Sequence, residues 1–294
     1  IIMKEKPFIH CFRTYNCCYF YDFNTNAIVR IPESVYVHLQ HLEKGTANIS
    51  ECDADVNEIL NRLTEQGFLS SHHWCKIEHP ASRLLENYLE GSVQSLTLQV
   101  TQQCNLKCEY CPYSGGFYNR QHNNRKMSFE IAKKAIDFYF LHSFDIPDAQ
   151  IGFYGGEPLI EFEMIRRIVE YCNNEYYGKK IRYFVTTNAT LLTEEKIDFL
   201  MKNNFVLTIS LDGPRQYHNK NRHRVDDTGS FDIVMENIKM VYRKYSDKKE
   251  NIQFNCVIDP EADLKCINDF FIKEEALREY RVLFNSISRE GIKE

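Results

Sequence analysis

The chain has 294 residues, of which 43% are hydrophobic and 26% are charged, and its formal net charge is −5. Its length suits one large domain or a small domain followed by a medium-sized one, and its composition suits a packed globular core. The charge gives no electrostatic footprint for nucleic acid, no apolar run approaches the ~20 residues of a membrane span, and residues 1–20 lack the core of a signal peptide.

Residues 1–78 predict a small α+β domain of the winged-helix type. Apolar and polar residues that alternate along the chain predict strands over 7–14, 17–23 and 28–31. Two helical patterns follow, the first with Pro32 at its start and Gly45 just past its end, and the second over 53–70. Residues 70–80, which read SSHHWCKIEHP, predict a linker.

Residues 79–294 predict an α/β domain with a parallel sheet. Six apolar runs alternate with helical patterns, and Ser128 and Thr193 are placed to cap two of the helices. Strands joined by helical crossovers pair in parallel, and such sheets carry their chemistry at the carboxyl ends of the strands. The predicted strands cover residues 95–100, 149–156, 181–189, 205–213, 251–259 and 280–288.

Three cysteines follow the first of these strands. With no signal peptide, we expect a cytoplasmic chain whose eleven cysteines are thiols or metal ligands rather than disulfides. Cys104, Cys108 and Cys111 have the spacing C-x3-C-x2-C. Three thiolates can hold a [4Fe–4S] cluster and leave one iron open for a small molecule. The alternative is a zinc knuckle with a fourth ligand elsewhere, such as Cys172, Cys256 or a histidine.

The segment CNLKCEYC resembles the signature of the radical S-adenosylmethionine (radical SAM) enzymes. In that superfamily the open iron is chelated by the amino and carboxylate groups of S-adenosylmethionine. Electron transfer then cleaves the sulfonium and produces a 5′-deoxyadenosyl radical, which takes hydrogen from the substrate. The resemblance implies a (βα)6 partial TIM barrel, catalytic cysteines at 104, 108 and 111, and an external electron donor such as a flavodoxin or ferredoxin.

The other strand ends also match the superfamily in their order along the chain. FYGGEPLIEF resembles the motif that holds the methionine amino group, mainly through its backbone, and TTNAT resembles a segment in which Ala189 here replaces a glycine. The resemblance places Arg222 on the methionine carboxylate and Ser210 on the ribose or carboxylate. The cofactor-binding residues that it implies are Tyr110, Gly155, Gly156, Glu157, Asn188, Ser210, Asp212, Arg222, Asn255 and Val257.

These motifs resemble a branch that modifies peptides and proteins. Residues 1–78 resemble the leader-recognition domain of ribosomal-peptide maturases, which binds the leader of a precursor peptide as an added strand, here near Val29, Arg30 and Ile31. The predicted reaction is hydrogen abstraction from such a precursor, giving a thioether or similar crosslink. The alternatives are formylglycine formation by a sulfatase maturase and a non-catalytic peptide-binding protein with a zinc knuckle.

Two further observations bear on this interpretation. A winged helix can bind DNA, but residues 1–80 hold seven Lys and Arg against ten Asp and Glu, a balance that repels phosphates. Members of the branch usually continue into a cysteine-rich domain with auxiliary clusters, whereas the last cysteine here is Cys266. We therefore expect either that this domain has been removed or that this homologue lacks it.

Overall fold

The computed structural model describes residues 6–45, 53–113 and 123–287, so the last residue of the predicted strand 280–288 lies outside the described residues. Contacts divide the chain into two units, Ile1–Ser82 and Arg83–Glu294. The sequence-based boundary at 78/79 falls inside the linker, just before this division. Each unit has its own hydrophobic core.

The first unit is a three-stranded antiparallel sheet with two helices on one face. The strands pair in the order β1-β2-β3, and the elements match those predicted from the sequence. Pro32 precedes the first helix, and Gly45 ends it in the left-handed conformation at φ 71°, as the sequence predicted. The elements are β1 (Ile9–Arg13), β2 (Cys18–Asp22), β3 (Ala27–Ile31), α1 (Glu33–Lys44) and α2 (Ala54–Glu65).

A short helical segment connects the linker to the second unit. The 3-10 turn η1 (Pro80–Leu84) runs into α3 (Leu85–Gly91), which the sequence reading did not predict. Most of the side chains of α3 are exposed. Leu85, Tyr88 and Leu89 have helical spacing, but they are exposed, so the helix has no buried apolar face in its unit.

The second unit contains a six-stranded sheet in the order β11-β10-β8-β7-β6-β4, and every neighbouring pair is parallel. The strands are neighbours in the sheet in the same order in which they follow one another in the sequence. This arrangement confirms the predicted (βα)6 partial barrel. Its strands are β4 (Ser95–Thr101), β6 (Asp148–Gly155), β7 (Lys180–Thr187), β8 (Phe205–Ser210), β10 (Ile252–Ile258) and β11 (Arg281–Ser286).

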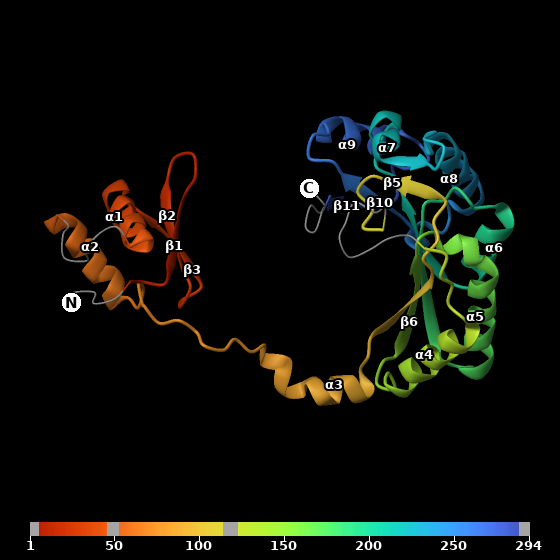
Figure 1. The fold of residues 1–294 in the computed structure, drawn as a ribbon, viewed down its shortest axis with the longest axis horizontal. Coiled ribbons are helices and arrows are strands. Elements are labelled where there is room, and N and C mark those ends of the chain that lie inside the picture. Colours follow the sequence, from red (N-terminus) through yellow and green to blue (C-terminus); the bar gives the residue numbers. More distant parts are fainter. Residues whose placement is uncertain (1–5, 46–52, 114–122, 288–294) are drawn as a thin grey trace. The chain divides into compact units, whose positions relative to one another are not determined.

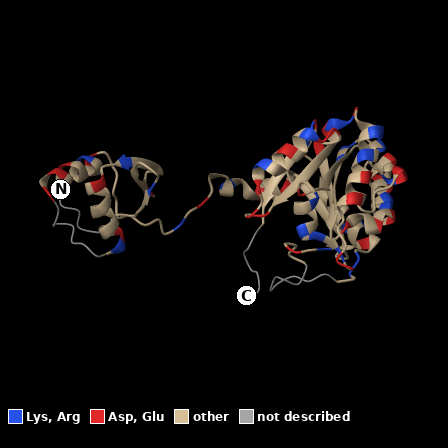
Figure 2. Ribbon diagram, turned by 90° about the horizontal axis from the view of Figure 1, so that it is seen from above, with Lys and Arg blue, Asp and Glu red and all other residues tan. Residues whose placement is uncertain are grey.

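Amphipathic helices cover the outer face of this sheet, and large buried side chains such as Tyr139, Phe153 and Phe205 fill the layer between them (Figure 1). The Ser128 hydroxyl accepts from the Ile131 amide and that of Thr193 from Lys196, which confirms both predicted caps. Figure 2 shows Lys and Arg interleaved with Asp and Glu along these helices. The helices are α4 (Phe129–Leu141), η2 (Pro158–Glu161), α5 (Phe162–Glu175), α6 (Glu194–Lys202), α7 (Arg215–Asn221), α8 (Phe231–Tyr245), η3 (Lys249–Asn251) and α9 (Leu264–Lys273).

A small antiparallel ribbon lies apart from the main sheet. It consists of β5 (Leu106–Cys108) and β9 (Arg222–Arg224), in which Leu106 faces Arg224 and Cys108 faces Arg222. The sequence did not predict this ribbon, because strands of three residues carry no readable alternation. In the described part of the chain, none of the helices is long and apolar enough to cross a membrane.

Candidate functional site

One pocket of about 350 Å³ lies at the carboxyl ends of the parallel strands. Its size is in the range of small-molecule sites. The three cysteines line it, and so does every predicted cofactor-binding residue except Asp212. Asp212 does not line the pocket but binds Arg222, which does. The lining residues are Cys104, Leu106, Cys108, Tyr110, Cys111, Pro112, Tyr113, Tyr154, Gly155, Gly156, Glu157, Thr186, Thr187, Asn188, Ser210, Arg222, Asn255, Val257, Ser286 and Ile287.

The cysteine loop is shaped by its own backbone. The Sγ of Cys104 accepts a hydrogen bond from the Leu106 amide at 3.4 Å, and the Cys111 amide donates to the Cys108 carbonyl at 3.1 Å. Burial raises the pKa of Cys104 to about 11 and that of Cys108 to about 12. Both thiols therefore keep their protons at neutral pH, and the binding of a metal would release these protons.

The two glycines allow the end of β6 to contact the cysteine loop. The amide of Gly156 donates to the Thr101 carbonyl at 3.0 Å, and that of Glu157 donates to Gln103 at 2.8 Å. A Cβ on Gly155 would lie 2.2 Å from the Thr101 oxygen, and one on Gly156 would lie 2.2 Å from the Gln103 oxygen. Side chains are excluded here because backbone packs against backbone.

The Glu157 carboxylate joins the ends of two strands. It accepts hydrogen bonds from the Leu159 amide at 3.0 Å, the Thr187 hydroxyl at 2.7 Å and the Asn188 amide at 2.8 Å. Burial raises the pKa of Glu157, while these three donors favour its charged form. The side chain thus holds β6 to the end of β7, and the backbone of residues 155–157 faces the pocket.

A side-chain network that the sequence did not reveal fixes Asn188. Its side-chain nitrogen Nδ2 donates to Oδ1 of Asn105 at 2.9 Å, and its side-chain oxygen Oδ1 accepts from the Thr190 hydroxyl at 2.7 Å. Asn105 donates in turn to Thr190 at 2.8 Å, so the cysteine loop is tied to the end of β7. Ala189 has φ 60°, a conformation that glycine adopts freely, which explains why a glycine is common at this point of the motif.

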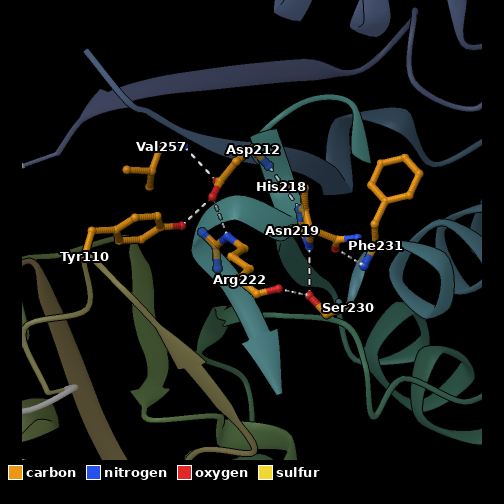
Figure 3. A network of polar contacts seen from close by, with 8 residues as sticks. All are labelled: Tyr110, Asp212, His218, Asn219, Arg222, Ser230, Phe231 and Val257. Atoms are coloured by element: carbon orange, nitrogen blue, oxygen red, sulfur yellow. Dashed lines mark hydrogen bonds and ion pairs between the residues drawn. The ribbon is translucent and has the colours of Figure 1, made fainter. Parts of the chain in front are cut away.

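Arg222 is held by a buried carboxylate (Figure 3). Its Nε donates to Oδ2 of Asp212 at 2.8 Å, and the Tyr110 hydroxyl donates to the same oxygen at 2.5 Å. The Val257 amide donates to the other oxygen at 3.0 Å. Burial acts to lower the pKa of Arg222, but the nearby Asp212 carboxylate, with Tyr110 and Cys108, raises it above its ordinary value. The guanidinium is therefore charged and fixed at the edge of the pocket.

The remaining predicted residues of the pocket come from β8 and β10. Ser210 ends β8, and Asn255 and Val257 lie two residues apart on β10, so both face the pocket. Asn255 accepts from the Asn285 side chain at 2.6 Å. Sequence reasoning missed Tyr113 and Tyr154, which also line the pocket; Tyr154 lies within the FYGGEPLIEF segment, but no role was assigned to it.

The predicted peptide-binding residues Val29, Arg30 and Ile31 lie in the first unit, on the edge strand β3. On the opposite edge, the Cys11 amide donates to Glu43 at 3.0 Å and so points away from β2. Backbone groups alternate along antiparallel strands. Following this alternation through both ladders directs the amides of Ile28 and Arg30 outward from β3.

The three cysteines and their neighbours in the pocket fit a cluster. Among the described residues, no group of three His, Cys, Asp or Glu side chains is arranged to hold one metal ion. A four-iron cluster spreads its cysteines over three corners of a cube, so its ligands lie farther apart than those of one ion. Three thiols lining a pocket, beside a glycine pair and a guanidinium, are a donor set that fits a cluster with a bound amino acid.

The comparisons with known proteins agree with this geometry. Residues 98–270 match the radical SAM superfamily. The serine-type anaerobic sulfatase-maturating enzyme of Bacteroides thetaiotaomicron is 31% identical over 57% of this chain and 37% of its own length. The radical SAM cyclopropyl synthase TigE of Paramaledivibacter caminithermalis is 28% identical over 79% of this chain and 52% of its own length.

Solved structures show the same fold. A structure of anSMEcpe with bound AdoMet and a peptide aligns with a TM-score of 0.57 at 24% identity, covering 66% of this chain and 51% of that one. The chain thus spans about half or less of the length of these relatives. Because the superfamily match covers more than half of the chain and includes every motif of the pocket, the chain belongs to the radical SAM superfamily.

Proposed function

We propose that this chain acts as a radical SAM peptide maturase, which abstracts hydrogen from a ribosomally synthesised precursor peptide and forms a thioether or similar crosslink. The observation that carries the proposal is the single pocket in which three cysteine thiols, two glycines and a fixed arginine meet. A [4Fe–4S] cluster and S-adenosylmethionine, when bound there, supply the 5′-deoxyadenosyl radical that abstracts the hydrogen. We also expect an external electron donor such as a flavodoxin or ferredoxin.

The residues of the pocket have distinct roles in this proposal. Cys104, Cys108 and Cys111 hold the cluster as thiolates. Arg222 binds the methionine carboxylate, because a planar guanidinium can donate two parallel hydrogen bonds to it. The backbone of Gly155 and Gly156 meets the methionine amino group. Ser210 bonds the ribose or the carboxylate, and Asn255 and Val257 line the adenosine pocket.

The extent of one similarity bears on the role of the first unit. The match to TigE covers 79% of this chain, which exceeds the share that the second unit makes up, so it includes at least the last part of the first unit. The sulfatase-maturating relative matches 57% of the chain, which the second unit alone can accommodate. A first unit that is shared in part with a radical SAM synthase is consistent with a role in recognising the substrate.

The edge of β3 is suited to bind the leader of the precursor. An extended peptide can add a strand to an exposed edge through main-chain hydrogen bonds. Among the described residues, the backbone of Ala27–Ile31 makes no hydrogen bond beyond its ladder with β2, whereas Glu43 covers the edge of β1. The leader would therefore pair with the outward groups of Ile28 and Arg30.

A matched pair of variants at Arg30 tests this part of the proposal. Arg30→Ala keeps the outward amide, whereas Arg30→Pro removes it without breaking the ladder with β2. In a titration of labelled leader from the proposed precursor, Arg30→Pro should weaken binding at least tenfold. Arg30→Ala should stay within about threefold of the parent, and salt should have little effect. Deleting residues 1–78 should abolish binding.

The opposite results would contradict the proposal. Equal affinity of Arg30→Pro and Arg30→Ala would exclude pairing along β3. Unchanged affinity after the deletion would exclude the first unit from recognition.

Formylglycine formation remains the second candidate, because a sulfatase-maturating enzyme is 31% identical to this chain. Product analysis separates the two functions. A crosslink joins two residues of the precursor and lowers its mass by two hydrogens: the 5′-deoxyadenosyl radical takes one hydrogen atom, and the other leaves as a proton while its electron passes to an external electron acceptor. Formylglycine forms at one cysteine or serine of a sulfatase-derived peptide and carries a reactive aldehyde.

A further inference from the structure

Arg222 belongs to a closed ring of four hydrogen bonds (Figure 3). Its Nε donates to Asp212 at 2.8 Å, and the Asp212 amide nitrogen lies 3.4 Å from Nδ1 of His218. The other ring nitrogen of His218, Nε2, lies 3.0 Å from Oγ of Ser230. Ser230 donates from Oγ to the carbonyl oxygen of Arg222 at 2.8 Å, which closes the ring.

Only one arrangement of protons satisfies this ring. A backbone amide can only donate, so Nδ1 of His218 must accept from Asp212. The imidazole then carries its proton on Nε2 and donates it to Ser230, whose own hydroxyl proton is directed to Arg222. His218 and Ser230 are fully buried, and burial lowers the pKa of His218 to about 4. The imidazole of His218 is therefore neutral.

The ring leaves the outer edge of the guanidinium available. Among the described residues, Asp212 is the hydrogen-bond partner found for the Arg222 side chain, and it takes Nε. The terminal nitrogens therefore remain for a ligand in the pocket that Arg222 lines. An arginine side chain loses much rotamer freedom when it binds a carboxylate in one orientation. Fixing both its backbone and its Nε beforehand reduces this loss.

We propose that His218 and Ser230 are positioning residues that aim the Arg222 guanidinium at the carboxylate of S-adenosylmethionine. The proposal rests on the function proposed above, in which Arg222 binds that carboxylate. His218 fixes the turn after β8 through the Asp212 amide, and Ser230 fixes the main chain at Arg222. Neither side chain lines the pocket, so both act through Arg222.

The test compares two ligands on the anaerobically reconstituted full chain. One is S-adenosylmethionine, and the other is decarboxylated S-adenosylmethionine, which lacks only the carboxylate. Ser230→Ala and His218→Ala should each weaken binding of S-adenosylmethionine about tenfold, as expected for one lost hydrogen bond or slightly more. Binding of the decarboxylated ligand should change less than twofold.

Two further variants separate positioning from general damage. His218→Gln keeps one acceptor and one donor on a single planar group, and it should recover most of the lost affinity. Asn219→Ala is the matched control on the same helix: it removes the hydrogen bond to the Phe231 amide at 3.0 Å but leaves the ring intact. This control should bind both ligands like the parent.

Each contrary outcome has a definite meaning. Equal losses for both ligands in Ser230→Ala, or no loss for either, would overturn the positioning role even if Arg222→Lys weakens only S-adenosylmethionine. If the parent binds both ligands equally and Arg222→Lys changes neither, the proposed carboxylate site itself is wrong, and the positioning role with it.

Discussion

The main chain of Cys108 pairs with that of Arg222 across the ribbon of β5 and β9. These residues are far apart in the sequence, yet the ribbon places a cysteine of the three-thiol loop beside the arginine at the pocket edge. Tyr110 strengthens this link, because its hydroxyl contacts the same Asp212 oxygen as Arg222. The cysteine loop and the arginine are therefore parts of one site.

Gly156→Ala should disturb the cysteine loop. Its Cβ would lie 2.2 Å from the Gln103 oxygen and 2.9 Å from the Cys104 amide, both of which are backbone atoms with little freedom to move. We expect the free energy of unfolding to fall by about 1–3 kcal/mol, the range for overpacking, and the iron content after reconstitution to fall with it. Urea unfolding and iron analysis measure the two effects.

Gly152→Ala, on β6 just before this position, is the control for this variant. Its nearest neighbour would be the Thr97 hydroxyl at 3.3 Å, which belongs to a side chain that can shift. It should retain full iron content. If Gly156→Ala also retains full iron content, the close approach of β6 is not needed to shape the loop.

Arg222→Ala should weaken binding of S-adenosylmethionine by roughly 1.5–3 kcal/mol, the range for a hydrogen bond to a charged group. It also leaves the Asp212 carboxylate buried without its partner, so the free energy of unfolding should fall by about 3–5 kcal/mol. The double variant Asp212→Asn/Arg222→Ala should recover part of the stability but none of the affinity. Recovery of affinity in the double variant would show that Arg222 acts only through folding.

The stability of the chain should depend on the protonation of His218. Its pKa is about 4 in the folded chain against an ordinary value of 6.5, because of burial and the nearby Arg222. Between these values the unfolded chain binds a proton that the folded chain does not, so stability is lost as pH falls from 6.5 to 4. His218→Gln should remove up to roughly 3 kcal/mol of this loss.

Urea unfolding of the cluster-free chain at several pH values measures this difference. The parent and His218→Gln should give curves that converge as pH falls below 6.5. Parallel curves across the whole window would mean that His218 is not buried in its neutral form.

The sequence predicted the parts of the fold and the site that depend on local pattern. Six apolar runs gave the strands, and the residues at their ends gave the lining of one pocket, because parallel strands bring their carboxyl ends together. The ribbon of β5 and β9 could not be predicted in this way, since it pairs two segments of three residues that are far apart in the chain.

The positioning groups were hidden for a similar reason. His218 lies on the short helix α7 and Ser230 directly precedes α8, where a polar residue usually faces water, and only their hydrogen bonds in the folded chain distinguish them. Asn105 lies in the cysteine motif at a position where any residue is compatible with the spacing, and its link to Asn188 depends on the folded loop. Interactions between side chains far apart in the sequence leave no periodicity to read.

The most direct test of the central claim is S-adenosylmethionine cleavage by the anaerobically reconstituted chain. The parent should bind about four irons and four sulfides per chain and release 5′-deoxyadenosine when a reductant is added. Replacing Cys104, Cys108 and Cys111 together by Ala should abolish both the cluster and the release. A triple variant that still produces 5′-deoxyadenosine, or a parent that binds one zinc ion and no iron, would contradict the assignment of this pocket.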